Sequence, residues 1–202
     1  MTITQNETDM NERRAFLRGA GLAAAGIGAF AAAGSPALAA TKRATGRGKA
    51  LAGSATDLDI LQVALALEHE GIAAYTIAGG SGLLTPDVLK VALVFLGHHK
   101  GHRDSLAGLI QKAGGKPVES KSDAEYVSEL NLGALKSQGD VVALATRLEM
   151  GAASAYVGQV AALKDHSLAR LFAQLSSDEA VHWAILNNAL GNPIPANAYL
   201  FG

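Results

Sequence analysis

Six glutamate and histidine residues interrupt otherwise apolar helical patterns and could together bind a metal ion. Carboxylate oxygens and neutral imidazole nitrogens are ligands that iron, manganese and zinc all accept. A buried carboxylate loses its hydration, which is strongly unfavourable unless the group is paired or bound to a metal. The alternatives are that some of these positions are partly exposed, or that Glu and His pair directly without metal. A shared metal would compensate all six residues at once. The candidate ligands are Glu68, His99, His102, Glu149, Glu179 and His182.

Four segments carry these residues, and their apolar positions recur at alternating steps of three and four, which indicates helices with one buried face. Thr56 or Asp57 is expected to cap the first helix, and Thr85 followed by Pro86 to begin the second. Each helix carries its Glu or His near the middle of the apolar stripe, so the six side chains should lie at similar depth. The predicted helices span about 57–78, 85–113, 139–164 and 166–190.

The lengths of the connections predict how these helices are arranged. The first and second helices, and the third and fourth, are joined by short breaks, so each pair should form an antiparallel hairpin. Residues 116–138 form a long connection, with a short helix expected around 123–134. An all-α four-helix bundle with one long crossover between its second and third helices has the ferritin-like arrangement.

At these residues the chain resembles the bacterial ferritin-like domain proteins, which include secreted and desiccation-related members. The resemblance covers about 56–190, and in that superfamily the first and third helices each give one Glu, while the second and fourth each give Glu-x-x-His. The fourth helix matches this motif with Glu179 and His182. Tyr75 and Tyr156 each follow a candidate glutamate by seven residues. The resemblance implies that these tyrosines are neighbours of the ligands, which they could hydrogen-bond or supply with an electron.

The second helix departs from the family pattern, because His99-Lys100-Gly101-His102 stands where Glu-x-x-His is expected. The resemblance implies that His99 replaces a carboxylate that bridges two metals, and the carboxylates then number three instead of four. This favours one tightly held ion, a pair bridged by hydroxide or oxide, or a second ion of lower occupancy. The remaining histidines are expected at the surface or at helix caps: His69, His98 and His166.

The first 39 residues resemble a twin-arginine signal peptide. Arg13 and Arg14 precede an apolar, glycine-rich run and a small-residue site, with cleavage expected near Ala39. Glu12 departs from the Ser or Thr that the consensus prefers. The apolar run of about 16 residues is shorter than the ~20 that a membrane span needs, so no anchor is expected in the mature form. The predicted units are the signal peptide 1–39, a flexible linker 40–55, the bundle 56–192 and a C-terminal tail 193–202.

Composition narrows the function classes further. The chain of 202 residues has no cysteine, so disulfides, thiolate nucleophiles and iron–sulfur clusters are excluded. A net charge of −1 without a basic stripe argues against nucleic-acid binding.

We therefore expect a periplasmic metal-binding protein that the twin-arginine translocase exports. Iron is the first expectation for the cofactor, as one or two ions, with manganese or zinc as alternatives. Oxidation of ferrous iron or consumption of peroxide under stress would suit such a centre, and a monomer or homodimer is expected. The alternative is a non-catalytic structural or desiccation-related protein that binds metal weakly or not at all. A manganese-catalase-like enzyme fits the fold, but the missing bridging carboxylate argues against it.

Overall fold

The computed structural model describes residues 56–202, so the predicted signal peptide and linker lie outside the described residues. Within this part every regular element is helical. None of its helices is both long enough and apolar enough to cross a membrane. The elements are α2 (Asp57–Gly79), α3 (Pro86–Lys112), α4 (Asp123–Glu129), η1 (Leu132–Ala134), α5 (Gln138–Gln159) and α6 (His166–Ala189).

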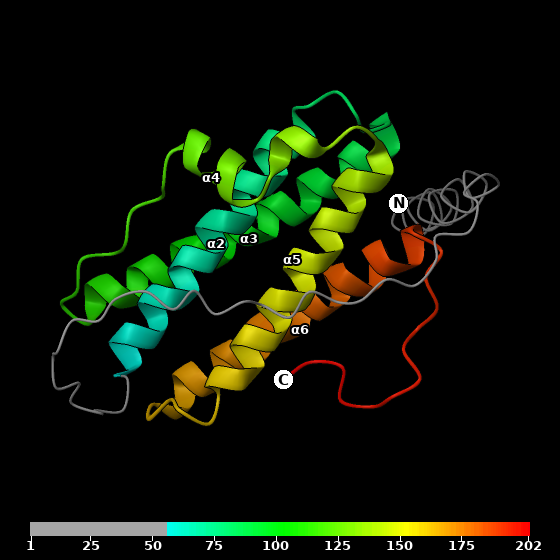
Figure 1. Ribbon diagram of the computed structural model, residues 1–202. Coiled ribbons are helices and arrows are strands. Elements are labelled where there is room, and N and C mark those ends of the chain that lie inside the picture. The colour runs from blue at the N-terminus through cyan, green and yellow to red at the C-terminus, as the bar shows by residue number, and fades with distance from the viewer. Residues whose placement is uncertain (1–55) are drawn as a thin grey trace, which may run out of the picture.

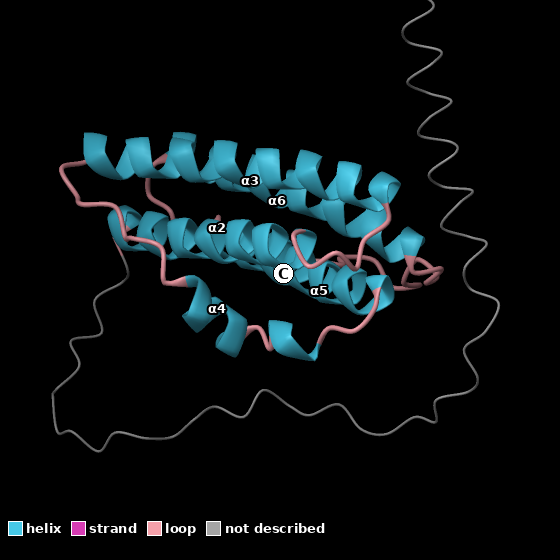
Figure 2. Cartoon of the chain, turned by 90° about the horizontal axis from the view of Figure 1, so that it is seen from above, coloured by secondary structure: helices cyan, strands magenta, loops and turns pink. Residues whose placement is uncertain are grey.

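Two helical hairpins, α2 with α3 and α5 with α6, pack together to form the bundle (Figure 1). Seen from above, α3 and α6 form one layer and α2 and α5 the other, while α4 lies on the outer side of α2 (Figure 2). Each of α2 and α5 packs more closely against its hairpin partner than against the other. The predicted bundle with one long middle connection is confirmed.

Local capping explains where the helices begin. The Thr56 side chain accepts a hydrogen bond from the Asp59 backbone N–H, and the Asp59 carboxylate accepts one in return from the Thr56 backbone. Thr85 is the N-cap residue of α3 and is followed by Pro86, whose fixed φ suits the first helical position. The predicted starts of these two helices are therefore confirmed.

Two predicted helix boundaries are wrong. The third helix ends at Gln159 instead of 164. The Asp57 carboxylate accepts hydrogen bonds from the backbone N–H groups of Lys164 and Asp165, at 2.9 Å each, and so holds a turn where the prediction had helix. The helix expected around 123–134 is two short elements, because Asn131 adopts a left-handed conformation (φ 53°) between them.

The apolar core consists of two clusters on either side of a polar layer. One cluster contains Leu61, Leu65, Leu106, Phe172 and the ring of Tyr156, among others. The other contains Phe95, Leu96, Val142, Leu186 and the ring of Tyr75. The glutamate and histidine side chains lie between these clusters, where apolar packing keeps bulk water away from them.

Candidate metal centre

All six predicted ligands meet in the polar layer between the two clusters. α2 contributes one glutamate, α5 contributes another, and α3 and α6 contribute two residues each. Five of the side chains are buried, with Glu179 0% and Glu68 1% exposed, and His102 is 12% exposed at its side chain. The structure therefore brings together the six side chains that helical periodicity predicted to lie at similar depth.

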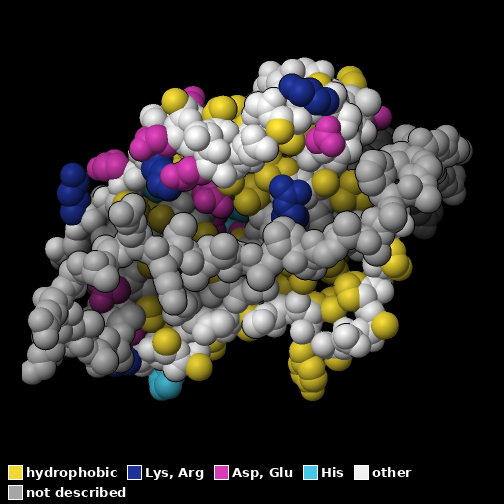
Figure 3. Space-filling view, in the orientation of Figure 1, with side chains coloured by type: hydrophobic (Ala, Val, Ile, Leu, Met, Phe, Trp, Pro, Cys, Tyr) yellow, Lys and Arg dark blue, Asp and Glu magenta, His cyan; other side chains and the backbone are white. Residues whose placement is uncertain are grey.

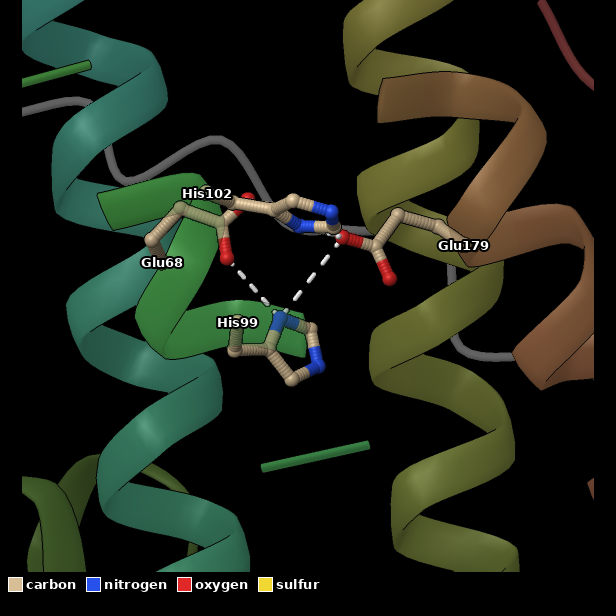
Figure 4. A group of neighbouring side chains, drawn as sticks. All are labelled: Glu68, His99, His102 and Glu179. Carbon is tan, nitrogen blue, oxygen red and sulfur yellow. Dashed lines mark hydrogen bonds and ion pairs between the residues drawn. The ribbon is translucent and has the colours of Figure 1, made fainter. Parts of the chain in front are cut away.

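The six residues form two overlapping sets of four, each with one ligand atom per residue within 4.8 Å of the others. We name the sets after the helix that provides the unshared glutamate. His99 and Glu179 belong to both, which is the arrangement expected of two adjacent ion positions. The α2-side group is Glu68, His99, His102 and Glu179 (Figure 4), and the α5-side group is His99, Glu149, Glu179 and His182.

Glu179 turns one carboxylate oxygen towards each group. Its Oε1 lies 3.2 Å from His102 Nδ1 in the α2-side group. Its Oε2 lies 2.9 Å from His182 Nδ1 in the α5-side group. A carboxylate with this orientation can bind two neighbouring cations at once, one through each oxygen.

His99 occupies the corresponding central position on α3. Its Nδ1 lies 2.8 Å from Glu68 Oε2 and its Nε2 lies 3.3 Å from Glu149 Oε1, so the ring spans the two unshared glutamates. The ring fits here because residue 71 is glycine: a Cβ on Gly71 would lie only 3.2 Å from the imidazole. The small residue on α2 thus accommodates an imidazole in the polar layer.

Two buried atoms of the α2-side group lack a hydrogen-bond partner among the described residues, namely His102 Nδ1 and Glu179 Oε1. They lie 3.2 Å apart without the geometry of a hydrogen bond. Buried polar atoms are rarely left unsatisfied, because each costs about 1–3 kcal/mol. A cation coordinated by both atoms would satisfy them, so the donor set fits a divalent metal.

The two predicted tyrosine neighbours connect the hairpins in a reciprocal way. Tyr75 on α2 donates a hydrogen bond to Glu149 on α5, and Tyr156 on α5 donates one to Glu68 on α2. Burial first, and then the negative charge of the bonded glutamate, raise the pKa of each phenol well above its ordinary value. Both hydroxyls therefore remain protonated donors that orient the carboxylates.

Two further residues contact the outer nitrogens of the histidines, and sequence reasoning missed both. Asp178 Oδ2 lies 3.2 Å from His102 Nε2, and His98 Nδ1 lies 2.8 Å from His182 Nε2. His98 is exposed, as predicted, but its ring reaches across to α6. Groups that contact a ligand histidine in this way fix its ring orientation and its tautomer.

The other two histidines stay away from the polar layer. His69 Nε2 lies 3.1 Å from the Val118 carbonyl oxygen, and His166 is the exposed first residue of α6. Their predicted positions at the surface or at a helix cap agree with the structure.

The two hairpins supply equivalent residues, which make equivalent contacts across the interface. Each hairpin supplies five residues in the same order along the chain. These are a glutamate ligand, the tyrosine that bonds the other hairpin's glutamate, a residue that contacts the other hairpin's outer histidine, a residue shared by both ligand groups, and an outer histidine. The first supplies Glu68, Tyr75, His98, His99 and His102, and the second supplies Glu149, Tyr156, Asp178, Glu179 and His182.

This equivalence shows that the second helix departs from the fourth at two positions. His98 and His99 stand where the other hairpin has Asp178 and Glu179. The first hairpin therefore lacks two negative charges that the second hairpin carries. The sequence could have indicated these two contacts, because His98 directly precedes His99 just as Asp178 directly precedes Glu179.

Without metal, the buried carboxylates are paired with protonated imidazoles. Burial alone would lower the pKa of His99, but hydrogen bonds to Glu149 and Glu68 raise it to about 11. Burial opposes protonation of His102 as well, yet the carboxylates of Glu179 and Glu68, 3.2 and 3.5 Å from its Nδ1, raise its pKa to about 10. Burial would raise the pKa of Glu68 and Glu149, but hydrogen bonds with these and neighbouring histidines hold both below the ordinary value.

Comparisons with known proteins find one matching family and a similar solved structure. The ferritin-like domain family model matches residues 56–192. The crystal structure of a conserved hypothetical protein from Mycobacterium tuberculosis aligns with a TM-score of 0.57 and 26% identity, covering 68% of this chain and 93% of that one. No curated protein matches.

Proposed function

The chain belongs to the ferritin-like domain family, and we propose that its polar layer binds two divalent ions, with iron as the first candidate. The observation that carries the proposal is the orientation of Glu179, whose two oxygens face His102 and His182 in different four-residue groups. Neither His102 Nδ1 nor Glu179 Oε1 makes a hydrogen bond among the described residues, and this supports the same proposal. The α2-side group would hold one ion and the α5-side group the other.

We propose ferrous iron oxidation by a peroxide as the activity. In this reaction two ferrous ions give one electron each, the peroxide O–O bond breaks, and two protons complete two water molecules. The protein's own contribution is positional. Tyr75 and Tyr156 hold the unshared glutamates, His98 and Asp178 hold the outer imidazoles, and the apolar clusters exclude water.

The charge balance of the polar layer gives His99 a distinct role. Three carboxylates leave two divalent ions with one uncompensated positive charge, so we expect the second ion to bind more weakly than the first. His99 offers one ring nitrogen towards Glu68 and the other towards Glu149. A protonated His99 must lose its proton before it can act as a ligand, which couples ion binding to proton release.

We propose further that the twin-arginine translocase delivers the protein to the periplasm in a folded state. The support is the sequence pattern of Arg13, Arg14 and the expected cleavage site near Ala39. All three residues lie outside the described part of the structure.

One observation favours a non-catalytic role instead. His99 and His102, with pKa values raised to about 11 and about 10, can neutralise two of the three buried carboxylates without a metal. A bundle with this internal charge balance could act as a structural or desiccation-related protein with weak metal binding.

Replacing Glu179 tests the proposed metal centre directly. Glu179→Ala removes the carboxylate shared by both groups, so both ions should be lost together. Asp178→Ala is the matched control, because Asp178 contacts only the outer nitrogen of His102 and should weaken binding by about 10–100-fold without abolishing it. Metal content of the purified proteins and calorimetric titration measure both. A wild-type protein without metal, whose melting temperature is unchanged by a chelator, would establish the non-catalytic alternative.

A further inference from the structure

A cleft between α2 and α5 leads from the surface to the polar layer. Its volume is about 210 Å³, and its inner end is formed by Glu68, Glu149 and His99. Glu68 belongs to the α2-side group, Glu149 belongs to the α5-side group, and His99 belongs to both. The space exists because small residues line the facing helices, with Gly71 on α2 and Gly151 on α5.

On the opposite side of the polar layer, neighbouring side chains contact the two outer histidines. On the α3–α6 side, Asp178 and His98 contact the outer nitrogens of His102 and His182. Phe95 stacks on His182 with the ring centroids 4.1 Å apart. The cleft on the α2–α5 side reaches ligands of both groups from the face that these contacts leave open.

Charge along the cleft favours a cation. Glu70 on α2 and Arg147 on α5 line it together with the inner Glu68, Glu149 and His99, so three carboxylates face one guanidinium and one imidazole. Acidic and basic side chains surround a hollow on this face of the molecule (Figure 3). A narrow cleft with walls of low dielectric focuses such a field and raises the local concentration of cations.

We propose that the α2–α5 cleft is the access route by which the divalent ion reaches its ligands, and that Glu70 is a transient ligand on that route. The inference rests on the proposed function, since it assumes that the polar layer binds metal. Glu70 differs from the six ligands in position, because it belongs to neither four-residue group. Its role is to capture the hydrated ion and to pass it inward to Glu68 or Glu149.

Blocking the cleft tests the route. Gly151→Leu adds a side chain at a position where a Cβ meets no atom within 4 Å, so the cleft can be filled without a backbone clash. Gly158→Leu is the control, because Gly158 lies two turns further along α5, is also open around its Cβ and does not line the cleft. Uptake of Co²⁺ by the metal-free full-length mature protein is followed by stopped-flow absorbance, and its release to excess chelator is followed in the same way.

A blocked route slows uptake and release by the same factor and leaves the equilibrium affinity unchanged. We expect Gly151→Leu to slow both about tenfold, equivalent to about 1.4 kcal/mol in the barrier, and Gly158→Leu to slow neither. Equal rates in the two variants would overturn the route. A change in affinity without matching changes in both rates would also overturn it, because the leucine would then act on the ligands.

Glu70→Gln provides a second variant that preserves size. We expect uptake to slow about threefold at low ionic strength and the difference to fade at high salt, because screening removes the attraction. Glu119→Gln, which removes an exposed charge outside the cleft, is the control. Unchanged uptake in Glu70→Gln would overturn the role of Glu70. A wild-type protein that takes up no Co²⁺ would instead overturn the proposed function together with the route.

Discussion

Tyr156 on α5 donates its phenolic hydrogen bond to Glu68 on α2, although the two residues are 88 positions apart in the chain. The phenol is buried, and its raised pKa keeps it a donor. One hydroxyl thus sets the orientation of a candidate ligand and joins the two hairpins. Stability and metal affinity should therefore respond together when this hydroxyl is removed.

Tyr156→Phe leaves a buried Glu68 oxygen without its donor. We expect the metal-free protein to lose about 1–3 kcal/mol of unfolding free energy, and metal affinity to fall about tenfold. Urea denaturation and metal titration measure the two effects. Tyr126→Phe on α4 is the control, because its hydroxyl lies 3.3 Å from the Lys121 backbone nitrogen, outside the centre. A loss of stability with unchanged affinity would show that Tyr156 does not orient a ligand.

His99→Glu would give α3 the central carboxylate that α6 already has. Four carboxylates neutralise two divalent ions, so metal content should rise to about two ions per chain and ferrous oxidation should become faster. The metal-free variant should melt at a lower temperature, because an imidazolium between three carboxylates is replaced by a fourth anion. His166→Glu, at the exposed start of α6, controls for the added charge. Unchanged or lower metal content would show that residue 99 does not occupy the shared position.

The metal-free protein should lose stability at alkaline pH. Its folded state raises the pKa of His99 to about 11 and of His102 to about 10, from an ordinary value of 6.5. A raised histidine pKa contributes stability that is complete below about pH 6.5 and is lost as the pH rises through the folded value. The melting temperature of chelator-treated protein should therefore fall between about pH 6.5 and pH 11, and fall less in His99→Gln. Equal slopes in both proteins would contradict the buried ion pairs.

At acid pH, the stability of the metal-free protein should depend on pH with the opposite sign. The folded state lowers the pKa of Glu68 and Glu149, so their contribution is present above the ordinary value of 4.5 and is lost as the pH falls below it. The melting temperature of the same metal-free protein should thus also fall below about pH 4.5, which leaves a plateau between the two limits.

Export can be tested on the precursor. Replacing Arg13 and Arg14 together by Lys should leave the uncleaved precursor in the cytoplasm, because the signal depends on the arginine pair. Arg18→Lys, outside the pair, should still be exported. Fractionation and immunoblotting detect both forms. Efficient appearance of the double variant in the periplasm would argue against the twin-arginine route.

Helical periodicity was sufficient to predict the bundle and to place the six candidate ligands at one depth. Each of the four apolar stripes is interrupted by Glu or His. Because a buried carboxylate such as Glu68 or Glu149 requires a partner, these interruptions predicted a shared site. Periodicity gives the angular position of a side chain on its own helix. It does not give the reach of that side chain towards a neighbouring helix, which is why the contacts of His98 and Asp178 were missed.

The end of α5 could not be predicted for a different physical reason. The turn after Gln159 is held by the carboxylate of Asp57, which is 107 residues away from Lys164 in the chain. A contact of that range overrides the local preference for helix, and a single sequence contains no local signal of it.

The exchange of contacts between hairpins also bears on how the protein folds. Each hairpin can form from local contacts, but the cross-hairpin hydrogen bonds of Tyr75, Tyr156, His98 and Asp178 span 74 to 88 residues and form only after the long middle connection has closed. Neither hairpin contains a complete ligand group. The last step of folding, docking of the two hairpins, therefore creates the ion-binding positions, and the rate of that step sets the earliest time at which a newly made chain can acquire metal.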